Sequence, residues 1–198
     1  MKKGFYEETA GIYRLQVPFD DLYTSVFLIV DREKKYLLDC ATTAEDVDGY
    51  ILPALREWGC ELSEIDAIVL SHKHADHAGG LSRILELAPG IEIVKEVRTL
   101  GAALSTYPLP GHMPDCIGLL DERTATLITA DGLQGAGVGK YRCSLKDREA
   151  YFQTLERLRT DDRIRNLLFS HAFEPWYSDR AIGRAKVLEC LSDCTKYL

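Results

Sequence analysis

The sequence predicts an α/β protein in which two sheets pack on each other with helices outside, a four-layer αββα sandwich. Two observations predict it. Short apolar runs of period two alternate with runs of helical period along all 198 residues, and each half of the chain ends in a helical run. The sheets should be mostly antiparallel or mixed. Periodicity alone does not separate this layout from other α/β arrangements. We expect residues 1–198 to form a single domain, because the chain contains no linker, repeat or low-complexity segment.

The first half of the chain opens as an antiparallel meander of β-rich runs separated by turn residues. Thr43 is then suited to cap a helix that ends at Gly59. The apolar face of that helix should consist of Val47, Ile51, Leu55 and Trp58. The strands expected in this half are 11–17, 25–30, 35–39 and 66–70.

The second half begins with a helix at 81–88 that Pro89 and Gly90 stop. A further helix should start near Ser144 and Asp147, which resemble a capping box, and turn Phe152, Leu155 and Leu158 inward. A last helix is expected over 178–197. The strands expected between these helices are 91–94, 103–109, 116–120, 125–129 and 166–169.

Charge and composition exclude several classes of partner. The formal net charge of −7 argues against long nucleic acid, which is bound mainly through a field of Lys and Arg. No apolar stretch is long enough to span a membrane, and no apolar signal region follows Lys2 and Lys3, so we expect a cytoplasmic protein. The six cysteines show no CxxC spacing and should be reduced, with Cys190 and Cys194 packed in the last helix. No feature of the sequence predicts an oligomeric state.

Histidines mark the functional site. His72, His74 and His77 are three of the five histidines in the chain and fall within six positions, together with Asp76. His72 and His74 cannot share a helix face at this spacing but can point the same way from an extended loop. The Gly79-Gly80 pair that follows lets the backbone pass close and start the next helix. This pattern predicts a metal site rather than isolated histidines.

The remaining ligand candidates lie on separate segments, each just past an expected strand. They are His112, His171 and Asp131. The carboxyl ends of strands are where α/β sheets gather their sites. A divalent ion of borderline hardness prefers imidazole nitrogen, and a carboxylate can bridge two such ions, so these seven side chains suit two metals.

The run from Ser71 to Gly80 resembles the (S/T)HxHxDHxGG motif of the metallo-β-lactamase superfamily. Pro110-Gly111-His112 is similar to the second histidine element of that family, Ala130-Asp131 to its bridging aspartate and Ser170-His171 to its last ligand. The resemblance spans nearly the whole chain. It implies the αββα metallo-β-lactamase fold, and at Asp39 an acidic residue that supports the ligands from behind.

Carried over residue by residue, the resemblance implies a dinuclear centre. His72, His74 and His112 would hold one ion, Asp76, His77 and His171 the other, and Asp131 would lie between them. Zinc is the expected metal, with manganese and iron also compatible with these ligands. A hydroxide bridging the two ions would attack the substrate, with Asp76 and Asp131 as the catalytic carboxylates and Asp76 passing a proton to the leaving group.

The resemblance leaves the reaction open, because the superfamily includes many activities. Asp131 in place of a cysteine argues against an antibiotic-hydrolysing enzyme, and Gly132 in place of a tyrosine argues against an acyl-homoserine lactonase. We expect a metal-dependent hydrolase of a small ester, thioester or lactone, with an anionic or acyl small molecule as its partner. Two alternatives remain: a mononuclear iron dioxygenase acting on a persulfide, and a non-catalytic metal-binding or regulatory protein.

Side chains beside the ligands are candidates for contact with the substrate. The argument for them is their position in loops next to the candidate ligands. Aromatic residues at the rim of a site can equally serve in packing rather than in contact with the substrate. The expected substrate-contacting residues are Tyr23, Met113, Gln134, Tyr141, Phe173 and Trp176.

Overall fold

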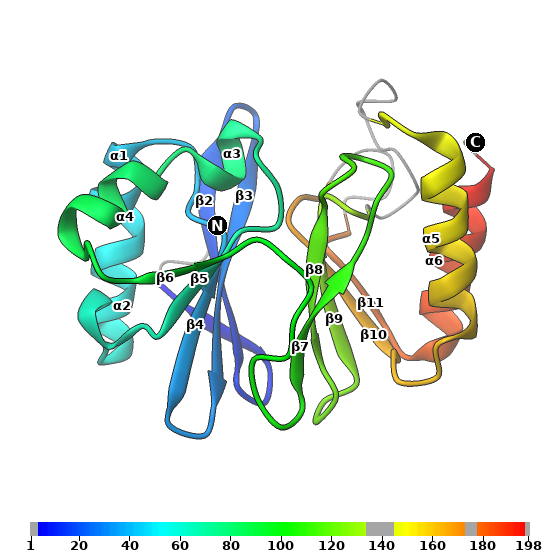
Figure 1. Ribbon diagram of the computed structural model, residues 1–198, viewed down its shortest axis with the longest axis horizontal. Helices are drawn as coiled ribbons and strands as arrows, with labels where there is room; N and C mark the ends of the chain where they lie inside the picture. The colour runs from blue at the N-terminus through cyan, green and yellow to red at the C-terminus, as the bar shows by residue number, and fades with distance from the viewer. Residues whose placement is uncertain (1–3, 134–144, 173–177, 197–198) are drawn as a thin grey trace. The chain divides into compact units, whose positions relative to one another are not determined.

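A computed structural model describes residues 4–133, 145–172 and 178–196. The chain divides into two compact units, Met1–Lys95 and Glu96–Leu198, and each is described by itself. Each unit contains one sheet with its own helices (Figure 1). The two mixed sheets with flanking helices confirm the predicted fold class. That residues 1–198 form a single domain stays a prediction.

The first unit is built on a six-stranded sheet in the order β1-β2-β3-β4-β5-β6. The first four strands form an antiparallel meander, of which the sequence predicts β2, β3 and β4 but not β1, and β4, β5 and β6 run parallel to one another. The bounds are β1 Tyr6–Thr9, β2 Ile12–Phe19, β3 Leu22–Asp31, β4 Lys34–Leu38, β5 Ala67–Val69 and β6 Glu92–Val94.

Helices cover one face of this sheet (Figure 1). Thr43 caps the first of them through a capping box with Asp46, which confirms the predicted start. The predicted helix from there to Gly59 is present in three parts, since a π-helical turn lies between two α-helical segments. The bounds are α1 Ala44–Asp46, η1 Val47–Ile51, α2 Leu52–Trp58, η2 Leu62–Glu64, α3 Ala75–Ala78 and α4 Leu81–Leu87.

The core under these helices is apolar, and the predicted helix face enters it. Val47, Ile51 and Leu55 are buried against Leu28, Leu37 and other strand residues. Trp58 lies at its edge, with its ring centroid 5.3 Å from that of Tyr13. Burial of apolar surface, at roughly 25 cal/mol per Å², is therefore what fixes the helices on the sheet.

The second unit has a five-stranded sheet in the order β11-β10-β9-β8-β7. Pairing is antiparallel except between β9 and β10, which are parallel. Helices α5 and α6 pack together on one face and bury their apolar sides against the strands (Figure 1). The bounds are β7 Leu104–Pro108, β8 Ile117–Asp121, β9 Thr126–Ala130, α5 Arg148–Thr160, β10 Asn166–Phe169, β11 Arg180–Ile182 and α6 Arg184–Thr195.

Two helix predictions in this unit are wrong in detail. Phe152 is 42% exposed, and Tyr151 is the buried aromatic residue on the inner face of α5, with Leu155 and Leu158. The last helix begins at Arg184 rather than near residue 178. Residues 180–182 pair with β10 as an edge strand, and Gly183, with a φ of +87°, makes the turn into the helix.

Five cysteines within the described ranges are buried and not in disulfides, including Cys190 and Cys194 in the core of the second unit. This agrees with the prediction of reduced packing thiols, while Cys143 lies outside the described residues. Within those ranges, no helix has both the length and the apolar character that a membrane crossing requires.

Candidate metal centre

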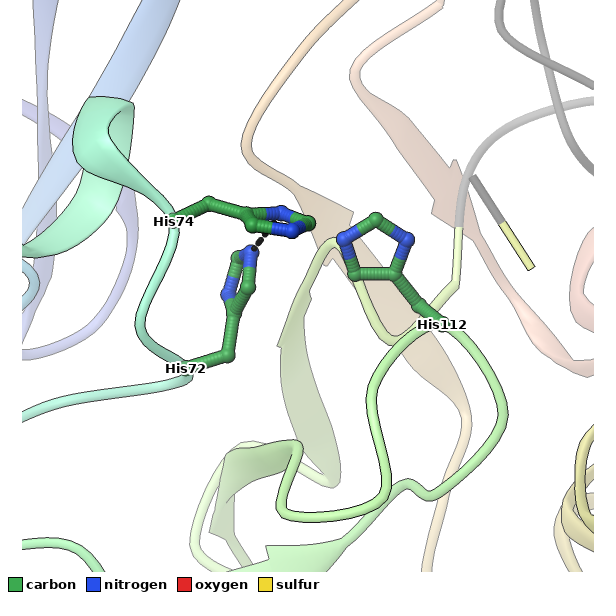
Figure 2. Close-up of side chains that lie close together, drawn as sticks. All are labelled: His72, His74 and His112. Carbon is green, nitrogen blue, oxygen red and sulfur yellow. Dashed lines mark hydrogen bonds between the residues drawn. The ribbon is translucent and has the colours of Figure 1, made fainter. Parts of the chain in front are cut away.

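The first unit carries four candidate ligands just beyond β5. His72 and His74 lie in the loop that follows this strand, and Asp76 and His77 lie in the short helix α3. His72 Nε2 is 3.0 Å from His74 Nδ1, so the two rings direct a nitrogen at the same point (Figure 2). Asp76 Oδ2 lies 3.2 Å from His77 Nε2. The HxHxDH segment therefore presents two separate donor pairs.

Asp39 joins this segment from β4, the strand that pairs with β5 in parallel. Because Leu38 is in register with Val69, the residues that follow the two strands meet at one edge of the sheet. Asp39 is fully buried, and its Oδ2 lies 2.7 Å from His77 Nδ1. Ser71 donates its backbone N–H to Oδ1 and its hydroxyl to Oδ2, both at 2.8 Å. One carboxylate thus orders both ends of the ligand segment.

These contacts determine which nitrogens are left for a metal. Since the Ser71 hydroxyl donates to Asp39, it accepts from His72 Nδ1, 3.0 Å away. His77 Nδ1 likewise donates to Asp39, which is an acceptor only. Both rings therefore carry their proton on Nδ1 and present an Nε2 lone pair. The sequence motif contains Ser71, but sequence reasoning did not assign it a role in the site.

The His72–His74 pair fits a shared cation. With the proton of His72 on Nδ1, its Nε2 is an acceptor that faces a second imidazole nitrogen at 3.0 Å. In a tetrahedral zinc site with the usual Zn–N bond length, two ligand nitrogen atoms lie roughly 3.3 Å apart. The observed separation is close to that value, so the donor set suits a metal of this kind.

The second unit carries three candidate ligands, each after a strand. His112, also drawn in Figure 2, follows β7, while Asp131 follows β9 and His171 follows β10. Because β9 and β10 are parallel, Asp131 and His171 meet, and His171 Nε2 is 3.2 Å from Asp131 Oδ1. His112 Nε2 is 3.9 Å from the other oxygen, Oδ2. The two oxygens of Asp131 are thus directed at two different imidazoles.

Taken by donor type alone, the candidate ligands of the two units fall into two sets. One type offers imidazole nitrogen alone and the other mixes imidazole with carboxylate. The first comprises His72, His74 and His112, and the second comprises Asp76, His77, Asp131 and His171. All except His74 and Asp76 are buried.

The backbone at the ends of β4 and β9 is strained. Asp39, Ala41 and Ala130 have φ values of +66°, +59° and +47°, a region that residues other than glycine rarely adopt. Strain of this kind is retained where surrounding structure over-determines it, often at functional sites. Burial, followed by the charge of Asp39, raises the pKa of the Cys40 thiol between these residues. Cys40 is buried in the hydrophobic core of the first unit, where a thiol serves as a packing group.

The predicted substrate-contacting residues are placed only in part. Tyr23 lies in β3 and is half-buried, and Met113 is buried in the hydrophobic core of the second unit. Gln134, Tyr141, Phe173 and Trp176 lie outside the described residues. Contact of these six side chains with a substrate stays a prediction.

Comparison with known proteins shows which family part of the chain is similar to. The model of the metallo-beta-lactamase superfamily matches residues 19–99. A metallo-beta-lactamase from Erythrobacter litoralis, solved with beta-mercaptoethanol in its active site, matches 98% of the chain with a TM-score of 0.71, 20% identity and 96% of its own length covered. The chain therefore shares the fold of this structure, and residues 19–99 are similar to the metallo-beta-lactamase superfamily.

Two curated proteins are similar to this chain over part of their length. A hydroxyacylglutathione hydrolase of Francisella tularensis subsp. holarctica is 24% identical over 112 residues, which are 48% of this chain and 44% of that protein. The thioesterase pkgB of Emericella nidulans is 27% identical over 128 residues, 58% of this chain and 37% of that protein. The chain thus spans less than half the length of either relative.

Proposed function

We propose that this chain is a member of the metallo-beta-lactamase superfamily and a dinuclear metal-dependent hydrolase of a small thioester, ester or lactone. His72, His74 and His112 hold one ion, Asp76, His77 and His171 hold the second, and Asp131 is shared. Zinc is the proposed metal, because its preference for imidazole and carboxylate matches all seven groups.

The observation that carries the proposal is the position of Asp131. Its two oxygens lie toward His112 and His171, one each, which is the arrangement of a carboxylate that serves two cations. A single structural ion would need only one of these oxygens. The Nε2 lone pairs of His72 and His77, fixed by Asp39 and Ser71, support the same proposal.

When bound, two divalent cations supply a Lewis acid for the substrate carbonyl and an activated water at neutral pH. The residues of the chain then have separate tasks. Asp39 and Ser71 hold two imidazoles in one tautomer and orientation, so that little reorganisation is needed during turnover. The Asp76 side chain remains 14% exposed and is the group proposed to pass a proton to the leaving thiol or alcohol.

Among the three substrate classes, the thioester has the most support. The two curated relatives are named for thioester-type hydrolysis, a hydroxyacylglutathione hydrolase and a thioesterase. A thiolate is also a good leaving group, so activation of the carbonyl and the water is the main demand on the enzyme. Hydrolysis then consumes one water and yields a carboxylic acid and a thiol.

The test is an assay of metal-loaded protein against a panel of small thioesters, esters and lactones. We expect thioester hydrolysis by the wild-type chain and a loss of at least about 100-fold in kcat/KM for Asp131→Asn, in line with the loss of a group that acts on developing charge. Asp115→Asn, an exposed aspartate of the same unit, serves as the matched control and should keep wild-type activity.

Two results would contradict the proposal. Equal activity of wild type and Asp131→Asn would show that any hydrolysis arises elsewhere. Oxygen consumption with a persulfide, together with no hydrolysis across the panel, would favour the iron dioxygenase instead. Circular dichroism of both variants separates a loss of chemistry from a loss of fold.

A further inference from the structure

A cavity of about 580 Å³ lies beside β7 in the second unit, apart from the candidate metal ligands. Its walls come from residues 97–99, from β7 and from the C-terminal end of α5. None of the described metal ligands lines it. Its volume lies within the range of about 300–1,000 Å³ that is usual for small-molecule sites.

The lining is basic although the whole chain is acidic. Arg98, Arg157 and Arg163 face one carboxylate, that of Asp161, in a protein with a formal net charge of −7. Arg163 is already paired with Asp161 at 2.7 Å and with Glu122 at 2.9 Å. Arg98 lies 3.8 Å from Glu96, in an exposed pair that water screens. Among the three arginines of the lining, Arg157 is the one for which these ion pairs do not account.

Arg157 is a partly buried cation, and no ion pair to it is found within the part of the chain that the structure describes. Its Nη2 donates to the backbone oxygen of Pro108 at 2.6 Å and to Thr154 Oγ1 at 3.3 Å. Its guanidinium carbon lies 5.6 Å from the ring centroid of Tyr107. Its Nε is buried and lacks a hydrogen-bond partner among the described residues.

An arrangement of this kind is costly without a ligand. The buried Nε–H of Arg157 has no acceptor among the described residues, and a buried N–H with no acceptor destabilises the fold. The contacts with Pro108, Thr154 and Tyr107 hold the guanidinium in one place, so a ligand need not order it on binding. Carboxylate and phosphate groups match the planar guanidinium fork.

We propose that this cavity binds a small molecule bearing two or more carboxylate or phosphate charges, with Arg157 as its main anchor and Arg98 as a second positive charge. The site is independent of the proposed hydrolase activity. It lies at the end of β7, four residues before His112, and Thr154 Oγ1 donates to the Pro110 backbone oxygen at 2.8 Å. A bound anion would therefore contact the element that leads to a candidate metal ligand.

The test uses calorimetric titration of the full chain with citrate and with inorganic phosphate, at constant ionic strength and with chloride as the reference anion. We expect saturable binding of citrate, of phosphate or of both. Tighter binding of one of them identifies whether the cavity prefers carboxylate or phosphate groups. Arg157→Gln should raise its Kd by about tenfold or more, as expected for loss of a charged hydrogen bond. Arg159→Gln, on the same helix and paired with Glu156, is the matched control and should leave Kd unchanged.

A second measurement needs no variant. Modification of arginine by a dicarbonyl reagent, read by mass spectrometry, should be slowed by the bound anion at Arg157 and left unchanged at Arg159. Equal Kd values for wild type and Arg157→Gln would place the anion elsewhere, for example at the metal ligands, and overturn the proposal. The absence of saturable binding of either anion at millimolar concentration would overturn it as well.

Discussion

Ser71 shows how much of a metal site is determined by residues that never touch the ion. Its backbone and hydroxyl both bind Asp39, and the same hydroxyl contacts His72. The carboxylate of Asp39 in turn contacts His77. A single buried network therefore sets the tautomers of two candidate ligands, one assigned to each ion in our proposal.

We predict that Ser71→Ala weakens metal binding without unfolding the chain. Loss of a hydrogen bond behind a ligand typically lowers metal affinity by about 10- to 100-fold. Competition with a chelator of known affinity measures this change. Ser71→Thr restores the hydroxyl and should restore the affinity, while Ser63→Ala, at an exposed serine, should have no effect. An unchanged affinity in Ser71→Ala would show that the network does not support the metal.

The seven candidate ligands could be named from the sequence because their types and spacing are specific. Ser71 was within the motif but was given no role, since a serine becomes informative only when its partners Asp39 and His72 are placed around it. Arg157 gave no signal at all. Its importance depends on a buried Nε without a hydrogen-bond partner among the described residues, which only a three-dimensional arrangement reveals.

At the scale of elements, the turn between α3 and α4 depends on two glycines. Gly79 has a φ of −67°, so its conformation suits any residue, and the need for glycine is steric. A Cβ at this position would lie 1.9 Å from the Thr42 backbone oxygen, and one at Gly80 would lie 2.2 Å from the Cys40 oxygen. This close approach confirms the role that the sequence predicts for the pair.

We predict that Gly79→Ala destabilises the protein by at least about 2 kcal/mol, because a backbone oxygen cannot move aside as a side chain can. Gly90→Ala is the matched control: nothing described lies within 4 Å of its added Cβ, and the change should stay within about 0.5 kcal/mol. Urea denaturation at neutral pH measures both. Equal midpoints for the two variants would contradict the steric argument.

Most strands were predictable because alternating apolar residues separate the two faces of a sheet. The helix at Thr43 was predictable because its cap and its apolar face agree. The last helix was placed too early, since residues 180–182 are too short a run to show strand periodicity and depend on pairing with β10. Phe152 was misplaced because Phe152 and Tyr151 both lie about one turn before Leu155, and the helix buries Tyr151.

At the scale of the whole molecule, the free energy of unfolding should depend on pH through one ion pair, that between Asp161 and Arg163. Hydrogen bonds from Arg163, and a further one from Tyr107, hold the pKa of Asp161 below its usual value. A carboxyl with a depressed folded pKa adds stability above its unfolded pKa of about 3.9, and that stability is lost as the pH falls through the folded value.

We therefore predict that Asp161→Asn lowers the free energy of unfolding at pH 7, by no more than about 1 kcal/mol because Arg163 is exposed. The difference from wild type should shrink as the pH falls below 4 and the wild-type carboxyl becomes protonated. Denaturant titrations at several pH values measure it. Asp162→Asn, at the exposed neighbouring aspartate, should show a smaller difference at pH 7. A difference for Asp161→Asn that is the same at every pH would contradict the assignment.

The central claim is that the histidines and aspartates of the chain serve two metal ions. Elemental analysis of protein purified without chelator or added metal tests it most directly. We predict close to two equivalents of a divalent metal per chain, with zinc the proposed element. One equivalent of iron would favour the mononuclear dioxygenase, and a chain that holds no tightly bound metal would contradict the account.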